Sequence, residues 1–384
     1  MESAGQSQRR MTDGWLGVDV DTPALLLDLQ KFEKNLDDMH AIAMANDVEL
    51  IPHAKTHRMP DAAVFQLKHC EGLSVAKLGE AEGFARAGVT RMFMAYPVVG
   101  EAKMPRALAL HTMVDMTFAV DSEDGASALG GYFADAGQVA KVMITIDSGL
   151  GRDGVSFSEA PDLADFIGAT AGLQLIGIYT HEGTVYSAAD ADDLEQQSLA
   201  VAGEMVRTAD AIRARGHELP VVSLGASASA RIAARAPGVT QVRPGIYAFN
   251  DVGQIALGNA TADTCAVRVI ATVVSHPEVG RACIDAGSKS LSRDLVPASA
   301  HRSDYPGYGK IVNAPGWQIE QLSEEHGWLR WVGDGSPTDL TVGTRLEIIP
   351  NHVCMVFAML RRATVIREGI IVGSWDGLGP GTSV

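Results

Sequence analysis

Short apolar runs alternate with longer stretches of helical spacing from about Thr22 to Asp251. The first run, ALLLDL (24–29), is followed by KFEKNLDDMHAIAMAND, in which apolar residues recur at the intervals of an amphipathic helix. Repeated units of this kind predict parallel strands joined by crossover helices. The later apolar runs are VELI, GLSVAK, RMFMAYPVV, MTFAVDS, KVMITIDS, LQLIGIYT, LPVVSLGAS and VTQVRPGIY.

About eight such units favour a closed (β/α)8 barrel of the TIM type over an open, doubly wound sheet, because the last strand of a barrel pairs with the first. We expect this barrel domain over residues 23–252. After Asp251 the helical periodicity largely disappears, and short β-rich runs such as CAVRVIATVVS and TRLEIIP predict an all-β C-terminal domain over residues 253–384. Residues 1–22 are expected to be a tail, loose over the first dozen residues, that leads into the β domain.

The charge balance narrows the class of protein. The chain has 384 residues, with 31 basic and 47 acidic side chains and a net charge of -16. Such a surface repels nucleic acid and anionic membranes, so neither is an expected partner. The four cysteines form no C-x-x-C pair, and neither a signal peptide nor a membrane-spanning run is evident, which together predict a cytoplasmic enzyme with reduced thiols.

Lys55 is the first candidate for chemistry. It lies in IPHAKTH, immediately after the predicted strand VELI, and residues at the carboxyl ends of barrel strands face the active site. A partly desolvated lysine there is suited to forming a Schiff base with an aldehyde cofactor. The alternative is an ordinary surface lysine in a loop.

Two segments late in the chain have the composition of a phosphate site. GASASA follows the strand VVSL and includes Gly225 and Ser227, whose small side chains permit close approach of backbone N–H groups. RPGIYAFND contributes Gly245 and the hydroxyl of Tyr247. Barrels often bind phosphate after their last two strands, although each motif taken alone is a common type of turn.

Three further side chains follow middle strands of the predicted barrel. Arg152, in TIDSGLGRDGV, is a candidate contact for a cofactor ring or its phenolate oxygen, or else a surface arginine paired with Asp147 or Asp153. Tyr179 and His181 end the strand in IYTHEG. His181 is suited to stacking on a ring or moving protons, or else to a structural hydrogen bond.

His352 and Cys354, in PNHVC, are the candidate metal ligands. They are spaced i, i+2 on what we predict to be a strand end, where alternation would put both side chains on one face. Imidazole and thiolate suit a divalent ion, with Zn²⁺ preferred because thiolate is soft, and Mn²⁺ or Mg²⁺ possible. The alternative is a buried cysteine beside an ordinary histidine.

The order of these motifs, from DTPALLLD through PHAKTH, YTHEG, SLGAS and RPGIYAFND to PNHVC, resembles the D-threonine aldolase / D-serine dehydratase family. This family is the metal-dependent branch of the alanine-racemase-like (fold type III) pyridoxal 5'-phosphate (PLP) enzymes. The resemblance covers nearly the whole chain and implies a homodimer. It implies that Lys55 is the Schiff-base lysine, Arg152 contacts the cofactor, Gly225, Ser227, Gly245 and Tyr247 lie in phosphate-binding segments, and His352 and Cys354 hold the metal.

The resemblance also implies the reaction. Aldolases of the family usually have H-x-D at the metal pair and the dehydratases H-x-C, so HVC favours a dehydratase of D-serine or D-3-hydroxyaspartate type that forms a keto acid and ammonia. Thr184 stands where dehydratases commonly have a second histidine, which leaves the catalytic base open. The alternatives are retro-aldol cleavage to glycine and an aldehyde, a racemase using a tyrosine such as Tyr305 or Tyr308, and a non-catalytic PLP-binding protein.

Overall fold

The computed structural model describes residues 14–297, 302–379 and 382, so most of the expected loose tail lies outside the described residues. The chain divides into two units. The barrel unit comprises residues 37–245 and the chain from Leu378 onward, and the sheet unit comprises the chain up to Leu36 and residues 246–377. Helix α2 (Leu29–Ala45) begins in the sheet unit and ends in the barrel unit.

Eight parallel strands form the barrel in the order β2-β9-β8-β7-β6-β5-β4-β3. The first and last of these strands meet where His53 and Ser74 form a parallel bridge and the Ser74 N–H donates to the Pro52 carbonyl at 2.8 Å. The predicted barrel is therefore confirmed. Its strands are β2 (Glu49–Leu50), β3 (Leu73–Val75), β4 (Arg91–Pro97), β5 (Asp115–Val120), β6 (Ala140–Ile146), β7 (Leu173–Thr180), β8 (Val221–Leu224) and β9 (Gln241–Val242).

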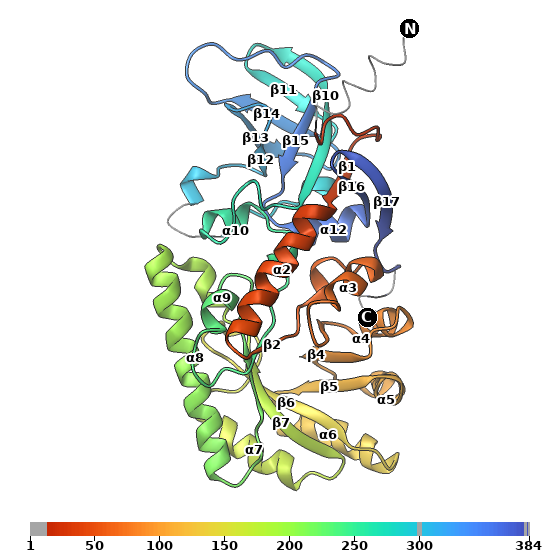
Figure 1. The fold of residues 1–384 in the computed structure, drawn as a ribbon, viewed down its shortest axis with the longest axis vertical. Coiled ribbons are helices and arrows are strands. Elements are labelled where there is room, and N and C mark those ends of the chain that lie inside the picture. The colour runs from red at the N-terminus through yellow and green to blue at the C-terminus, as the bar shows by residue number, and fades with distance from the viewer. Residues whose placement is uncertain (1–13, 298–301, 380–381, 383–384) are drawn as a thin grey trace. The chain divides into compact units, whose positions relative to one another are not determined.

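Helices alternate with these strands along the chain, and Figure 1 shows α5, α6, α7 and α8 around the outside of the strands. No helix among the described residues is long and apolar enough to cross a membrane. The helices of the barrel unit are α3 (Pro60–Gln66), α4 (Leu78–Arg86), α5 (Met104–Met113), α6 (Glu123–Asp135), α7 (Ala160–Ala169), α8 (Ala191–Ala214) and α9 (Ala230–Ala233).

Side chains from successive strands fill the inside of the barrel. One buried cluster brings together Ile51, Phe93, Ala119, Met143 and Tyr179, which follow β2 or lie on β4, β5, β6 and β7. Strands that are covered on both faces require nearly continuous apolar sequence, and β6 (AKVMITI) meets that requirement with all but one residue buried. The barrel is thus a packed core, and its chemistry is confined to the loops at the strand ends.

The sheet unit is built on nine strands, of which seven follow the order β13-β14-β11-β10-β1-β16-β17, while β15 pairs with β10 and β12. Among the described residues, all of its pairings except β1 with β16 are antiparallel, which agrees with the predicted β-rich domain. Three short helices in the same ranges accompany these strands. The elements are β1 (Ala24–Asp28), β10 (Val267–Glu278), β11 (Arg281–Ile284), β12 (Lys310–Ile311), β13 (Trp317–Leu322), β14 (Gly327–Trp331), β15 (Arg345–Ile349), β16 (Arg362–Arg367), β17 (Ile370–Asp376), α10 (Val252–Ala256), α11 (Ser288–Leu291) and α12 (Val353–Leu360).

Strand β1 lies in the middle of this second sheet. It pairs antiparallel with β10 and parallel with β16, and Leu26 packs in a buried cluster with Ile270 and Ile366. The sequence pattern places this strand in the barrel, because a short apolar run followed by a helix is also the pattern of a barrel unit, and the observed pairing corrects that expectation. Its actual partners lie more than 200 residues further along the chain, and no local pattern identifies them.

Candidate active site

Lys55 lies in a single 3₁₀ turn, Ala54–Thr56, directly beyond β2. Its side chain is exposed, whereas residues 51–54 and 56–57 on either side of it are buried. The His53 Nδ1 atom accepts a hydrogen bond from the Lys55 N–H at 3.4 Å. A buried turn therefore presents one exposed amine at the carboxyl end of a barrel strand.

Gly245 packs against this turn. A Cβ atom at Gly245 would lie 2.5 Å from Thr56 Oγ1 and 3.1 Å from the His53 carbonyl oxygen, so a larger residue does not fit without rearrangement. The Gly245 N–H donates to Ser227 Oγ at 3.0 Å. The fold thus brings both predicted phosphate segments of the barrel unit together beside the Lys55 turn. Tyr247 follows in the turn Ile246–Ala248, which is assigned to the sheet unit, and its side chain is buried.

A buried carboxylate holds the loop that contains Ser227. The Gly225 N–H donates to Glu182 Oε1 and Oε2 at 3.0 and 2.9 Å, the Ala226 N–H to Oε2 at 3.2 Å, and the Ser229 hydroxyl to Oε1 at 3.0 Å. Glu182 is fully buried. Burial raises its pKa and these hydrogen bonds lower it. Gly225 adopts φ 93°, a left-handed conformation that favours glycine.

Glu182 is not among the site residues that the sequence predicts. Its only signal in the sequence is that a carboxylate follows a strand end, at YTHE, where a barrel loop would ordinarily turn toward solvent. The donors that it satisfies lie more than 40 residues away, so the role emerges only from the fold.

His181 precedes Glu182 and lies among three positive charges. Burial lowers its pKa to about 3, and the charges of Lys55, Arg152 and Arg243 add to this effect. His181 is therefore a neutral imidazole at neutral pH. Arg152 itself is exposed in the loop after β6 and pairs with Asp153 at 2.9 Å. Thr184 lies in the 3₁₀ turn Gly183–Ser187 that follows.

Tyr179 and Arg243 lie deeper in the barrel. The Tyr179 hydroxyl accepts a hydrogen bond from Thr145 at 2.9 Å, and burial raises the tyrosine pKa to about 12. The Arg243 guanidinium lies 4.9 Å from the Tyr179 ring centroid and donates to Ser223 Oγ and the Thr180 carbonyl. Arg243 is only 7% exposed, and burial lowers its pKa. Arginine nevertheless remains charged in proteins, so Arg243 is a fixed cation that the sequence analysis did not identify.

The sheet unit contains His352 and Cys354, but not on a strand. β15 ends at Ile349, His352 is the N-cap of α12, and Cys354 lies in the first turn of that helix. The expectation that strand alternation aligns the two side chains was therefore wrong, because the chain turns into a helix after Pro350. The pair is nevertheless in contact, since the two side chains share a hydrogen bond.

Two aspartates organise this pair. His352 Nδ1 lies 2.6 Å from Asp294 Oδ2, which leaves Nε2 as the ring nitrogen available to a metal ion. The buried Asp251 accepts the Val353 N–H at 3.1 Å, and burial raises the pKa of Asp251 to about 6. Burial lowers the pKa of His352. Its hydrogen bonds with Cys354 and Asp294 and its electrostatic interactions with Cys354 and Asp251 outweigh this effect and raise the pKa to about 10. Across the described residues, no group of three or more histidine, cysteine or carboxylate side chains is arranged to hold a metal ion.

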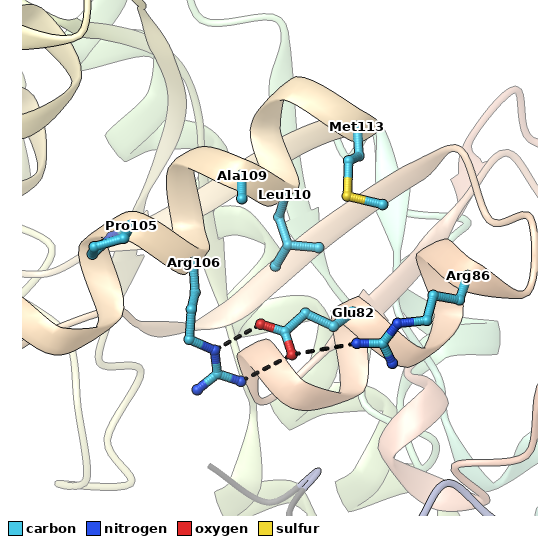
Figure 2. A pocket seen from close by; sticks show the side chains of 7 residues that line it. All are labelled: Glu82, Arg86, Pro105, Arg106, Ala109, Leu110 and Met113. Atoms are coloured by element: carbon cyan, nitrogen blue, oxygen red, sulfur yellow. Dashed lines mark hydrogen bonds and ion pairs between the residues drawn. The ribbon is translucent and has the colours of Figure 1, made fainter.

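A separate cavity of about 240 Å³ lies between α4 and α5. Figure 2 shows that Glu82 on α4 pairs with Arg106 on α5, at 2.6 Å, and with Arg86, beside the apolar side chains of Leu110 and Met113. None of the predicted site residues lines this cavity. Because both helices lie outside the strands, we do not assign the cavity to the active site.

Comparison with known proteins gives the class. Residues 27–251 match the family "Alanine racemase, N-terminal domain" and residues 266–366 match the "Putative serine dehydratase domain". The chain belongs to the alanine-racemase-like family of PLP-dependent enzymes, in its D-threonine aldolase / D-serine dehydratase branch, whose members are lyases.

Individual relatives cover nearly the whole chain. A D-threo-3-hydroxyaspartate dehydratase of Delftia sp. (strain HT23) is 33% identical over 94% of this chain and 97% of the relative. A D-threonine aldolase of Arthrobacter sp. is 30% identical over 93% and 92%. A solved D-threo-3-hydroxyaspartate dehydratase, a cysteine-to-alanine variant described as metal-free, is 30% identical with a TM-score of 0.85 over 96% and 99%.

Replacing Glu182 with alanine tests the loop clamp. Glu182→Ala leaves the Gly225 and Ala226 N–H groups without an acceptor and leaves the Ser229 hydroxyl only a 3.5 Å contact with the Ala226 carbonyl oxygen. Each buried donor without a partner costs about 1–3 kcal/mol. We expect the free energy of unfolding to fall by at least about 2 kcal/mol, measured by denaturant unfolding. Glu195→Ala is the control, because Glu195 is an exposed carboxylate on α8 that pairs with Arg235. Equal stabilities for the two variants would remove the clamp role.

Proposed function

We propose that the chain is a PLP-dependent, metal-assisted lyase that eliminates water from a β-hydroxy D-amino acid. The enamine that is released tautomerises to an imine, and hydrolysis of this imine by water gives a 2-oxo acid and ammonia. One observation carries the proposal: the Gly245–Ser227 pair packs directly on the turn that presents Lys55. The Lys55 amine is suited to react with the aldehyde of an aldehyde phosphate, and the adjacent Gly245–Ser227 pair is suited to bind its phosphate. The large sheet unit with its His352–Cys354 pair argues against a non-catalytic PLP-binding protein.

The residues of the barrel unit fit this cofactor. A Cβ atom at Gly245 would meet Thr56 and His53, so glycine permits the close packing of this segment on the Lys55 turn, and its N–H holds Ser227 Oγ in place. Glu182 fixes the loop that supplies Ser227 and Gly225, and we assign the phosphate to these groups, with Tyr247 contributing its hydroxyl. When bound, PLP withdraws electrons from the substrate α-carbon and so makes its proton acidic.

The roles of the remaining residues follow from their charges. Lys55 holds the cofactor and, once released from it, accepts the proton from the substrate α-carbon. Arg152 and the buried Arg243 provide positive charge for the cofactor and the substrate carboxylate. His181 has a pKa of about 3 and is therefore neutral, so we assign it to stacking on the cofactor rather than to acid catalysis.

We assign the divalent ion to His352 and Cys354. The donor set fits such an ion, because Asp294 binds Nδ1 and orients Nε2 of the imidazole beside the thiol. The thiol favours Zn²⁺, with Mn²⁺ and Mg²⁺ as alternatives. The ion would supply Lewis acidity toward the substrate β-hydroxyl. A solved D-threo-3-hydroxyaspartate dehydratase variant is described as being in the metal-free form, which supports the assignment of a metal ion to an enzyme of this kind.

Cys354 favours elimination over retro-aldol cleavage, because H-x-C is the pattern of the dehydratase branch. Product analysis with D-serine, D-threonine and D-threo-3-hydroxyaspartate distinguishes the two reactions. A 2-oxo acid with ammonia supports the dehydratase, whereas glycine with an aldehyde makes the chain an aldolase. Racemised substrate without either product would favour the racemase, although Tyr305 packs against an apolar cluster of the sheet unit.

We further propose that the protein works as a cytoplasmic homodimer. The family resemblance implies the homodimer, and the four cysteines, none of which forms a disulfide, are typical of a reducing compartment. Light scattering after size exclusion measures the oligomeric state, and a monomeric active enzyme would contradict the dimer.

Lys55 is expected to be the residue that holds the cofactor. Borohydride reduction followed by peptide mapping should label Lys55, because its amine is exposed beside the phosphate turn. Lys55→Ala should remove the visible absorbance of bound cofactor and nearly all turnover. A label on Lys77 or Lys103 would overturn the assignment.

Removal of the metal should stop turnover without releasing PLP. We expect His352→Ala and Cys354→Ala to retain the cofactor absorbance and to lose activity, because the hydroxyl leaving group lacks its Lewis acid. Elemental analysis should find less metal in both variants than in wild type. Cys283→Ala is the control, because Cys283 lies on β11 and belongs to no proposed site. Full activity of wild type after exhaustive chelation would refute the metal-assisted mechanism.

A further inference from the structure

The chain that leaves the Lys55 turn meets a distant segment of the barrel unit at Arg58. The N–H groups of His57 and Arg58 donate to the Ala54 carbonyl at 3.2 and 2.9 Å, so Arg58 closes the turn that presents the amine. The Arg58 carbonyl in turn accepts the Leu378 N–H at 2.7 Å. A residue more than 300 positions further along the chain is therefore bonded to the exit of the Lys55 turn.

Arg58 adopts a backbone conformation that arginine rarely adopts. Its φ is 52°, in the left-handed region where a Cβ atom is strained and glycine is favoured. Its side chain accounts for the conformation, because Arg58 Nε lies 2.6 Å from Oε1 of Glu80, which is fully buried. A buried carboxylate that loses its cationic partner destabilises the fold. The ion pair therefore holds Arg58 in a conformation that its backbone alone disfavours.

Helix α4 holds both Arg58 and Leu378. Glu80 and Gly83 are three residues apart on this helix, and residues at that spacing are neighbours on a helix surface. A Cβ atom at Gly83 would lie 2.5 and 2.8 Å from Cδ2 and Cδ1 of Leu378, so the glycine provides the room in which this leucine docks. Gly83 lies in the interior of a helix, where glycine is unfavourable relative to alanine. The docking of Leu378 gives a reason for glycine at this position.

We infer that Leu378 is a positioning residue for Lys55, acting through the backbone of Arg58. This inference rests on the proposed function, in which Lys55 holds the cofactor and then accepts a proton. The Lys55 side chain is exposed, so packing around it contributes little and the position of the amine depends on the turn. Leu378 and Glu80 keep the exit of that turn in one conformation. Precise placement of a reacting group is a large part of catalysis, so a loosened turn weakens cofactor binding and turnover.

Hydrogen exchange of the full-length protein measures the turn without any need for turnover. Leu378→Ala should raise the exchange rates of the His57 and Arg58 amides by at least about tenfold, because the turn opens more often when its docked partner is weakened. Leu378→Met keeps the volume of the side chain and should exchange like wild type. Leu199→Ala is the matched control, because Leu199 is an exposed leucine on α8.

A double-variant cycle tests whether Gly83 acts through Leu378. Gly83→Ala should raise the Kd for PLP, titrated by the visible absorbance of the bound cofactor, by about tenfold, the effect of one lost hydrogen bond. In the Leu378→Ala background the same substitution should have no further effect, because the methyl carbons that the new Cβ would meet are absent. Gly131→Ala on α6 should keep the Kd of wild type, because a Cβ atom at Gly131 meets nothing within 4 Å.

The outcomes separate this inference from the proposed function. If Leu378→Ala and Gly83→Ala loosen the Lys55 turn while wild type neither binds PLP nor turns over amino acids, the link between Leu378 and the turn stands and the lyase function fails. If wild type is a PLP-dependent lyase but both variants keep its exchange rates and its Kd for PLP, the positioning role is wrong and the lyase function stands. A lower unfolding midpoint with unchanged exchange and Kd would also overturn the inference, since Leu378 would then be a packing residue alone.

Discussion

The parallel bridge between His53 and Ser74 is the contact on which the geometry of the barrel unit depends, because it joins the two ends of the eight-stranded sheet. Ser74 is fully buried and uses both its backbone N–H and its hydroxyl here, bonding to Pro52 and Ile51 at 2.8 Å each. β2 has only two residues, so side-chain and loop hydrogen bonds must complete the closure. Since Lys55 follows this bridge directly, the position of its amine is a consequence of barrel closure.

A balance of buried charges lies beneath that amine. Arg243 is a cation with almost no exposure, and Glu182 is a fully buried carboxylate whose negative charge acts on it. Each alone would be costly to bury, but the backbone N–H groups at Gly225 and Ala226 and the oxygens at Ser223 and Thr180 satisfy them. Burial keeps His181 neutral, and the positive charges of Lys55, Arg152 and Arg243 add to this effect. The same positive charges favour an anionic cofactor.

A structural feature could be predicted from the sequence when the residues that cause it lie close together along the chain. The strand ends at Lys55, Ser227 and Gly245 were identified because an apolar run followed by small or polar residues is a local signal. Glu182 and Arg243 were missed because each works through partners on other strands. The His352–Cys354 pair was predicted in part. The residue types and their spacing indicated that the two side chains lie together, but they are aligned by the start of helix α12 and not by the predicted strand. β1 was grouped with the barrel for the same reason, since its partners are set by the whole fold.

The same physical device recurs in both units. Glu182 in the barrel unit accepts N–H groups from the turn that precedes α9, and Asp251 in the sheet unit accepts the N–H of Gln254 at the start of α10 and that of Val353 at the start of α12. Each is a fully buried carboxylate, and each fixes the turn that contains a proposed ligand: Ser227 in one unit, His352 in the other. A buried carboxylate destabilises the fold unless each of its oxygens accepts a hydrogen bond. The turn that donates these hydrogen bonds therefore has little freedom to move away from the carboxylate. Loops at the ends of strands are ordinarily the most mobile parts of a barrel. These two carboxylates give them the rigidity that cofactor and metal binding require, without using any side chain that touches the substrate.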